Sequence, residues 1–159
     1  MIFKSMQSYE WIHYSTKEID SFLPENNKRI VNNVKPVGLY ASVGVRWLQL
    51  LYDREELYND DFDGLYIYRV EPSKDAVILD ITPQTVETIG NVYRFEQSDG
   101  TLVPRLDWVR IAECYDGVFV DVDNIKQSFG NDKTEWYWFA CAFDVPTLCM
   151  WRHATIRMK

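Results

Sequence analysis

Residues 35–42 have the sequence KPVGLYAS, and they decide the fold expected for this chain. The aliphatic and aromatic side chains of residues 37–42 favour a β-strand. The polar run of residues 24–36, which contains four Asn residues, predicts a loop before this strand. Gly44 opens a predicted helix that carries Trp47 and three Leu residues. The stretch therefore predicts a loop, a strand and a helix in direct succession.

Short elements of both kinds are predicted on either side of this stretch. Residues 9–14 (YEWIHY) favour a first strand, and Ser15 and Glu18 form an S-x-x-E capping box that predicts a helix after it. A helix is expected from Thr82-Pro83 to about Gly90. Further patterns predict strands over 65–70, 76–81, 117–122, 136–142 and 148–151, and a helix over 105–114. Without a regular strand–helix–strand alternation, these elements predict an α+β fold with a split, mostly antiparallel sheet.

Size and composition restrict the class of protein further. A length of 159 residues predicts one domain over residues 1–159. The net charge of −7 disfavours binding to duplex nucleic acid, because an acidic surface repels phosphates. Six Trp and ten Tyr residues are more than one small core needs, and they indicate an aromatic cleft. No stretch approaches the ~18 apolar residues of a membrane span, so we expect a cytoplasmic protein with no membrane partner.

The common catalytic and metal-binding signatures are absent from the sequence. Three Cys residues form no CxxC pair and only two His residues are present, so no metal site is expected. The GxGxxG, GxxxxGK[ST], HExxH and GxSxG motifs do not occur. A Rossmann dinucleotide site is therefore not supported.

Four segments together resemble a known family. His13-Tyr14-Ser15 closes the first predicted strand, and KPVGLYAS follows about 25 residues later, with Trp47 close behind. The order resembles the His-Tyr-Glu class of ADP-ribosyltransferases, and it is closest to small phage and bacterial members with the pattern K-P-x-G-L-W-x-S. Residues 107–120 resemble the D-W…A…Y-D-G-I-E-I run of that group, and residues 143–151 resemble its W-D-x-x-S-G-C-I-W end.

The resemblance implies a function, a cofactor and a set of site residues. It implies an ADP-ribosyltransferase that binds NAD and transfers ADP-ribose to a macromolecular acceptor, a host protein in the host cytoplasm if the chain is phage-encoded. His13 would bind the adenosine ribose, Ser15 the ribose next to nicotinamide, and Tyr40 would stack on the nicotinamide ring. Tyr14 and Ser42 complete the implied cofactor-binding set. An acid on a later strand would bind the reacting ribose and stabilise its cationic transition state.

One position departs from the family pattern. Phe119 occupies the place of the acid in the Y-D-G-I-E-I run, and a phenyl ring can neither accept the ribose hydrogen bond nor stabilise a cation by charge. Asp121 lies two residues further on, on the same face of the predicted strand but displaced by ~7 Å. Asp121 and Tyr40 are therefore the expected catalytic residues, with Glu135 as a weaker substitute for the acid.

Two other functions remain open. A degenerate fold that has lost catalysis could act as a binding module or as an inhibitor of a host protein, which Phe119 favours. Alternatively, an aromatic surface around residues 136–139 could bind a partner without any nucleotide. The difference depends on whether a carboxylate lies near His13 and Tyr40 in the folded chain.

Each candidate residue also has a simpler explanation. His13 fits a partly buried structural histidine, and Ser15 fits a helix cap alone. Tyr40 and Trp47 fit core aromatics. Asp123 fits the cap of a following helix, and the acidic run 60–63 fits a solvated turn rather than a cation loop.

Overall fold

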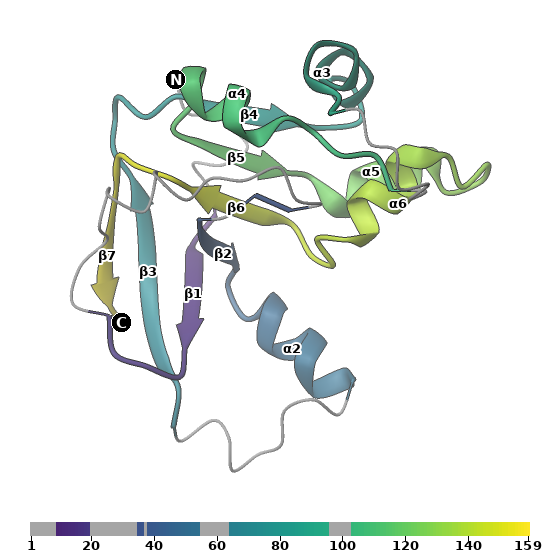
Figure 1. The fold of residues 1–159 in the computed structure, drawn as a ribbon. Helices are drawn as coiled ribbons and strands as arrows, with labels where there is room; N and C mark the ends of the chain where they lie inside the picture. Colours follow the sequence, from purple (N-terminus) through teal and green to yellow (C-terminus); the bar gives the residue numbers. More distant parts are fainter. Residues whose placement is uncertain (1–8, 20–34, 37, 55–63, 96–102) are drawn as a thin grey trace.

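A single hydrogen-bonded sheet organises the chain in a computed structural model, which describes residues 9–19, 35–36, 38–54, 64–95 and 103–159 (Figure 1). The seven strands lie in the order β4-β5-β6-β2-β1-β3-β7, and β4 with β5 is the one parallel pair among them. Five short helices accompany the sheet in the described residues, so the predicted α+β class is confirmed. The strands are β1 (Trp11–Ser15), β2 (Leu39–Val43), β3 (Tyr66–Pro72), β4 (Ile78–Ile81), β5 (Gly117–Val120), β6 (Thr147–Met150) and β7 (Ala154–Met158).

The sheet is strongly curled, so that β4, β5 and β6 run across the strands β1, β3 and β7 (Figure 1). The predicted split into separate sheets is wrong, because β2 pairs with both β1 and β6 and keeps the ladder continuous. The two halves nevertheless meet through little backbone. β1 and β2 pair at Trp11↔Val43 and Ile12↔Ser42, whereas β2 and β6 pair at four positions. The weakest ladder therefore lies between β1 and β2.

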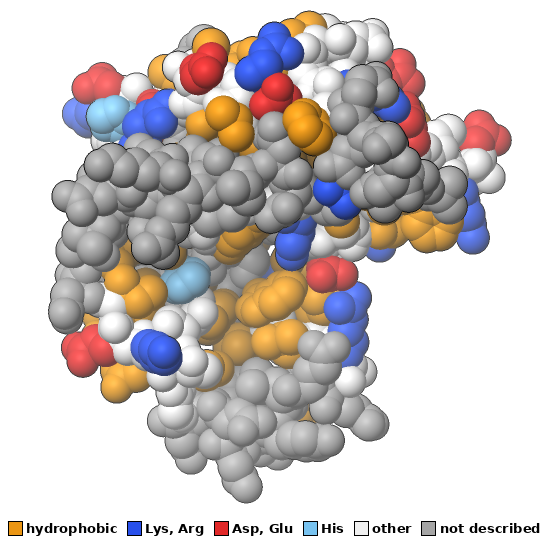
Figure 2. Space-filling view, viewed as in Figure 1, with side chains coloured by type: hydrophobic (Ala, Val, Ile, Leu, Met, Phe, Trp, Pro, Cys, Tyr) orange, Lys and Arg blue, Asp and Glu red, His pale blue; other side chains and the backbone are white. Residues whose placement is uncertain are grey.

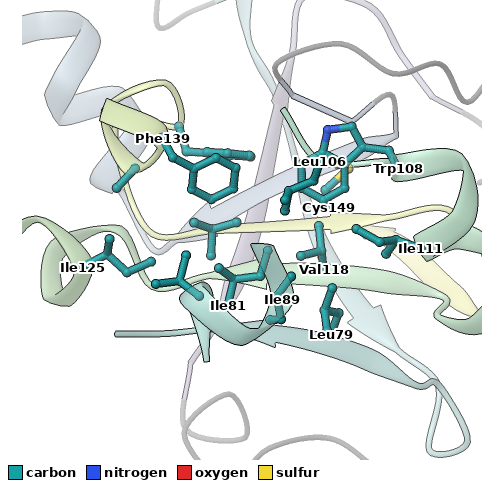
Figure 3. Close-up of a cluster of buried hydrophobic side chains, with 14 of the residues drawn as sticks. Leu79, Ile81, Ile89, Leu106, Trp108, Ile111, Val118, Ile125, Phe139 and Cys149 are labelled. Carbon is teal, nitrogen blue, oxygen red and sulfur yellow. The ribbon is translucent and has the colours of Figure 1, made fainter. Parts of the chain in front are cut away.

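Two apolar clusters cover opposite faces of β5. Val118 and Val120 belong to the larger cluster, where four helices pack on β4, β5 and β6 (Figure 3). These helices are α3 (Val86–Tyr93), α4 (Trp108–Cys114), α5 (Val122–Phe129) and α6 (Glu135–Cys141). Phe119 points the other way, into a smaller cluster with Trp11 and Leu148. This alternation is the period-2 pattern of a strand buried on both faces.

Residues 135–141 form α6, so the predicted strand over 136–142 is wrong. Aromatic composition suggested the strand, but the buried positions Trp136, Phe139 and Ala140 follow helical spacing, and Trp138 is 42% exposed. In a strand, Trp136 and Trp138 would share one face. The position of the buried side chains therefore decides the element, against local propensity.

Other predicted boundaries also shift. The helix expected from Thr82 begins at Val86, because Thr85 Oγ1 donates to the Asp80 carbonyl at 2.6 Å and closes a turn first. Gly90 lies inside that helix rather than at its end, and a Cβ there would overlap the Trp136 ring. The strand expected over 117–122 ends at Val120.

Two predicted helices are confirmed near their expected positions, and one strand was not predicted. The helix α2 (Arg46–Asp53) confirms the one expected after Gly44, and α4 begins behind Asp107, which accepts a hydrogen bond from Arg110 N at 3.1 Å. The strand β7 was not predicted. Residues 16–19, at the start of the helix expected after Ser15, are not helical, and the rest of that helix and the acidic run 60–63 lie outside the described residues. Within the described part, no helix is long and apolar enough to cross a membrane.

Candidate functional site

A cavity of about 250 Å³ opens where the β1–β2 ladder ends. Figure 2 shows hydrophobic side chains gathered in this hollow between β1 and α2. Four of the predicted cofactor-binding residues meet there, although they come from segments nearly 30 residues apart. The lining residues are Ile12, His13, Tyr14, Lys35, Tyr40, Ala41, Ser42, Trp47, Phe143, Val145 and Thr147.

His13 bridges the two strands beyond the last backbone pair. Its Nδ1 lies 2.6 Å from the Tyr40 carbonyl oxygen. A carbonyl can only accept, so Nδ1 carries the proton and donates. In the neutral ring, Nε2 is then left as an acceptor. The side chain thus replaces a ladder hydrogen bond and also offers a lone pair to a ligand hydroxyl.

Tyr40 is held rigidly at the wall of the cavity. Its hydroxyl donates to the Pro36 carbonyl, and burial, followed by the neighbouring Cys149, raises the pKa of the phenol above its ordinary value. Tyr40 therefore stays neutral and has no acid–base role near neutral pH. The Lys35 ammonium lies 5.6 Å from the centre of the Tyr40 ring, within the range of a cation–π interaction.

Two buried polar residues, Ser42 and Thr147, lie at the back of the cavity. They lie opposite each other in the β2–β6 ladder and are 5% and 6% exposed. Thr147 Oγ1 donates to the Val145 carbonyl at 2.6 Å. The Ser42 hydroxyl has no hydrogen-bond partner in the described part of the chain. A buried unpaired hydroxyl is costly, so this position lowers the stability of the fold.

The rim of the cavity is fixed by α2. Arg46 pairs with Asp123 at 3.0 Å, and Arg54 pairs with Asp144 at 2.9 Å. The two ion pairs attach α2 to the first turn of α5 and to the connection between α6 and β6. Tyr14 adds a hydrogen bond from its hydroxyl to the Gly44 carbonyl at 2.7 Å. Both ion pairs are exposed, so they position the rim more than they stabilise the fold.

The carboxylates proposed for catalysis lie elsewhere. Asp121 is the N-cap residue of α5 and not a strand residue, so the expectation that it shares a strand face with Phe119 is wrong. Its carboxylate accepts from Asn124 Nδ2 at 2.9 Å. Glu135 is paired with Arg94 at the start of α6. Phe119 is 3% exposed and packs edge-on against Trp11. Among the described residues, no Asp or Glu lines the cavity.

Ser15 is also placed outside the cavity. It ends β1 on the surface, where its hydroxyl donates to the Lys17 carbonyl at 2.6 Å and accepts from Lys17 N at 3.0 Å. These bonds form a local turn at the strand end, and they occupy the hydroxyl that the resemblance assigns to the ribose. His13, Tyr14, Tyr40 and Ser42 are thus brought together, and Ser15 and Asp121 are not.

Sequence reasoning missed Lys35 and Thr147 as cavity residues, although both lie in segments that it singled out. It also missed Asp80, which lies near the carboxyl end of β4, at the edge of the sheet and outside the cavity lining. Burial and then the charge of Asp121 raise the pKa of Asp80 to about 6. A lone Asp in the apolar run VILDI was the signal for it. No group of three potential metal-ligating side chains occurs in the described ranges.

Comparison with known proteins gives no matching family model, no similar curated protein and no similar solved structure. The chemistry of the cavity is therefore inferred from its residues. It offers aromatic walls, one acceptor nitrogen, one unpaired hydroxyl and one cation, which suit the binding of a planar ring with polar substituents.

Proposed function

We propose that this chain is a nucleotide-binding module with an ADP-ribosyltransferase-like fold, which binds NAD or ADP-ribose at the β1–β2 cavity without cleaving it. The observation that carries the proposal is the meeting of His13, Tyr14, Tyr40 and Ser42 in one cavity. The sequence resemblance implies a cofactor-binding role for the same four residues. The short β1–β2 ladder supports the proposal too, since the cavity lies beside the point where the paired positions of these two strands end.

The size of the cavity sets how a nucleotide binds. A volume of about 250 Å³ is below the range that encloses a drug-sized ligand. The cavity therefore receives one ring, and the rest of the nucleotide lies along the rim. The acceptor nitrogen of His13 is suited to a ribose hydroxyl on that path.

Catalysis is left out of the proposal for a chemical reason. Breaking the N-glycosidic bond creates positive charge on the ribose, which a positioned carboxylate must stabilise. The described residues that line the cavity supply no carboxylate, and the Lys35 charge has the wrong sign. Loss of one such electrostatic contact lowers turnover by roughly 10²–10³-fold.

Thermal unfolding with NAD or ADP-ribose tests the binding. Ligand at 100 times its dissociation constant stabilises the folded state by about 2.7 kcal/mol, which raises Tm by roughly 5–10 °C for a chain of this size. Tyr40→Ala is expected to abolish the rise, whereas Tyr52→Ala, at an exposed position of α2, keeps it. A ligand-independent Tm in the wild-type protein would refute the binding. Release of nicotinamide from NAD above the uncatalysed rate would refute the absence of turnover.

A further inference from the structure

We propose that Lys35 is an internal competitor at the β1–β2 cavity: its side chain covers the Tyr40 ring in the unliganded protein and must move away before a ligand ring can stack there. This inference rests on the proposed function, and it concerns how access to that same site is controlled. It makes Lys35 a residue that lowers the affinity for the nucleotide, rather than one that binds its phosphates.

The contact between the two side chains is made inside the proposed binding site. Lys35 Nζ lies 5.6 Å from the centre of the Tyr40 ring, and both residues line the cavity. An aromatic face attracts a cation at this distance, because its quadrupole presents negative charge there. The apolar stem of a lysine side chain can cover the ring at the same time. Within the cavity, the Tyr40 ring is therefore already in use.

The backbone beside Lys35 is attached to the same tyrosine. The Tyr40 hydroxyl donates to the carbonyl of Pro36, the residue that follows Lys35. Tyr40 thus holds this short stretch twice, through its hydroxyl and through its ring. Because the hydrogen bond keeps the Lys35 backbone close to the ring, the ammonium competes for that ring at a high effective concentration.

No described carboxylate draws Lys35 away from the ring. Arg46 and Arg54 on the rim are each paired with an aspartate, at 3.0 and 2.9 Å, whereas Lys35 forms no ion pair within the described ranges. Lys35 is an exposed residue, so its side chain can turn into water without crossing the core. The cover is therefore reversible, because a weak contact holds it and nothing described blocks its departure.

The strength of a cation–π contact sets the size of the effect. At an exposed site, such a contact favours the covered state by roughly two- to fivefold. A ligand that binds only the uncovered ring then has an apparent dissociation constant about three- to sixfold higher than it would have without the cover. Lys35 therefore tunes the affinity of the cavity without closing it.

Titration with NAD and with ADP-ribose, followed by tryptophan fluorescence, tests the inference in about 0.5 M salt, which screens the attraction between phosphates and lysine. Lys35→Ala is expected to lower both dissociation constants about three- to sixfold, because it removes the cover. Lys35→Arg keeps a cation that can lie over Tyr40, so it should lack this gain. Lys74→Ala removes the same charge at an exposed turn and should change neither constant.

A second readout follows Lys35 directly in the wild-type protein by NMR. Protons that lie over an aromatic ring resonate upfield, so the ε-methylene signals of Lys35 should lie upfield of those of Lys74. The Lys35 signals are assigned by their loss in Lys35→Arg. They should move to the position of the Lys74 signals when the cavity is saturated with NAD, and in unliganded Tyr40→Leu.

The outcomes separate the two proposals. Unchanged or weaker binding of either ligand by Lys35→Ala, with the circular dichroism of the wild type, would overturn the competition and leave nucleotide binding intact. Saturation of the wild type with NAD without movement of the Lys35 signals would overturn it as well. Failure of NAD and ADP-ribose alike to bind to the wild type and to Lys35→Ala would overturn the proposed function, and this inference with it.

Discussion

Replacement of Asp80 by Asn is expected to stabilise the protein above pH 6 and to have little effect near pH 4. Asp80 lies on β4, where one carboxylate oxygen is buried without a hydrogen-bond partner in the described residues. Burial and the charge of Asp121 raise the pKa of Asp80 from 3.8 to about 6. The folded state therefore holds this proton more tightly than the unfolded state does.

The sign and size of the effect follow from this difference. As the pH rises from about 4 to 6, the unfolded chain loses the proton first, and the folded state becomes less stable relative to it. The full difference between 3.8 and about 6 corresponds to about 3 kcal/mol. Because the side chain is partly exposed, water screens the charge and about 1 kcal/mol is a better expectation. Asn does not titrate, so Asp80→Asn removes this loss above pH 6.

Urea unfolding between pH 4 and pH 8, followed by tryptophan fluorescence, measures the difference in free energy of unfolding. The gap between Asp80→Asn and the wild type should open between pH 4 and 6 and stay constant above that range. Asp75→Asn, at an exposed turn, is the matched control and should show no such change. A gap that does not depend on pH, or a variant less stable than the wild type at pH 8, would refute the reasoning.

Three further predictions concern packing and the cavity. Gly90→Ala should lower the free energy of unfolding by about 1–3 kcal/mol in urea, because the added Cβ overlaps the Trp136 ring and this outweighs the better helix propensity of Ala. Arg152→Met should cost about 3 kcal/mol by the same measurement, since the part-buried Asp116 loses the guanidinium at 2.8 Å and keeps only neutral donors such as Val77 N. Ser42→Ala should leave the protein as stable or slightly more stable by the same measurement, because it removes a buried hydroxyl that has no hydrogen-bond partner in the described residues.

The sequence predicted the elements whose local signals agree with their packing. The stretch KPVGLYAS predicted β2, and Gly44 predicted the region where α2 begins. In both places the local strand or helix propensity agrees with the turn residues beside it. It failed at α6, where aromatic residues favour a strand locally but pack on helical spacing against the sheet. It also failed at β7, whose short sequence ATIRM carries no clear strand pattern and gains its structure from the neighbouring β3.

The sequence predicted those residues of the candidate site that lie in recognisable local motifs, and it did not predict the rest. A motif was enough to select His13 and Tyr40, because each belongs to a short segment with a recognisable pattern. The isolation of the Ser42 hydroxyl and the position of Lys35 over Tyr40 depend on which segments meet in space, which no local pattern encodes. Asp121 was misplaced because one residue decides whether a chain continues a strand or turns into a helix cap.

The two-residue ladder between β1 and β2 has a mechanical consequence. Among the described strands, the hydrogen-bonded ladder joins the curled halves of the sheet through two residue pairs, with the Gly44 N to Glu10 carbonyl bond at 3.0 Å beside them, and the chain also crosses between the halves from β3 to β4 and from β6 to β7. Bending of one half against the other therefore concentrates at this seam. A ligand wedged between His13 and Tyr40 would brace the seam, and amide hydrogen exchange in β1 and β2 would slow together on binding. Occupancy of the cavity would then set the stiffness of the whole sheet.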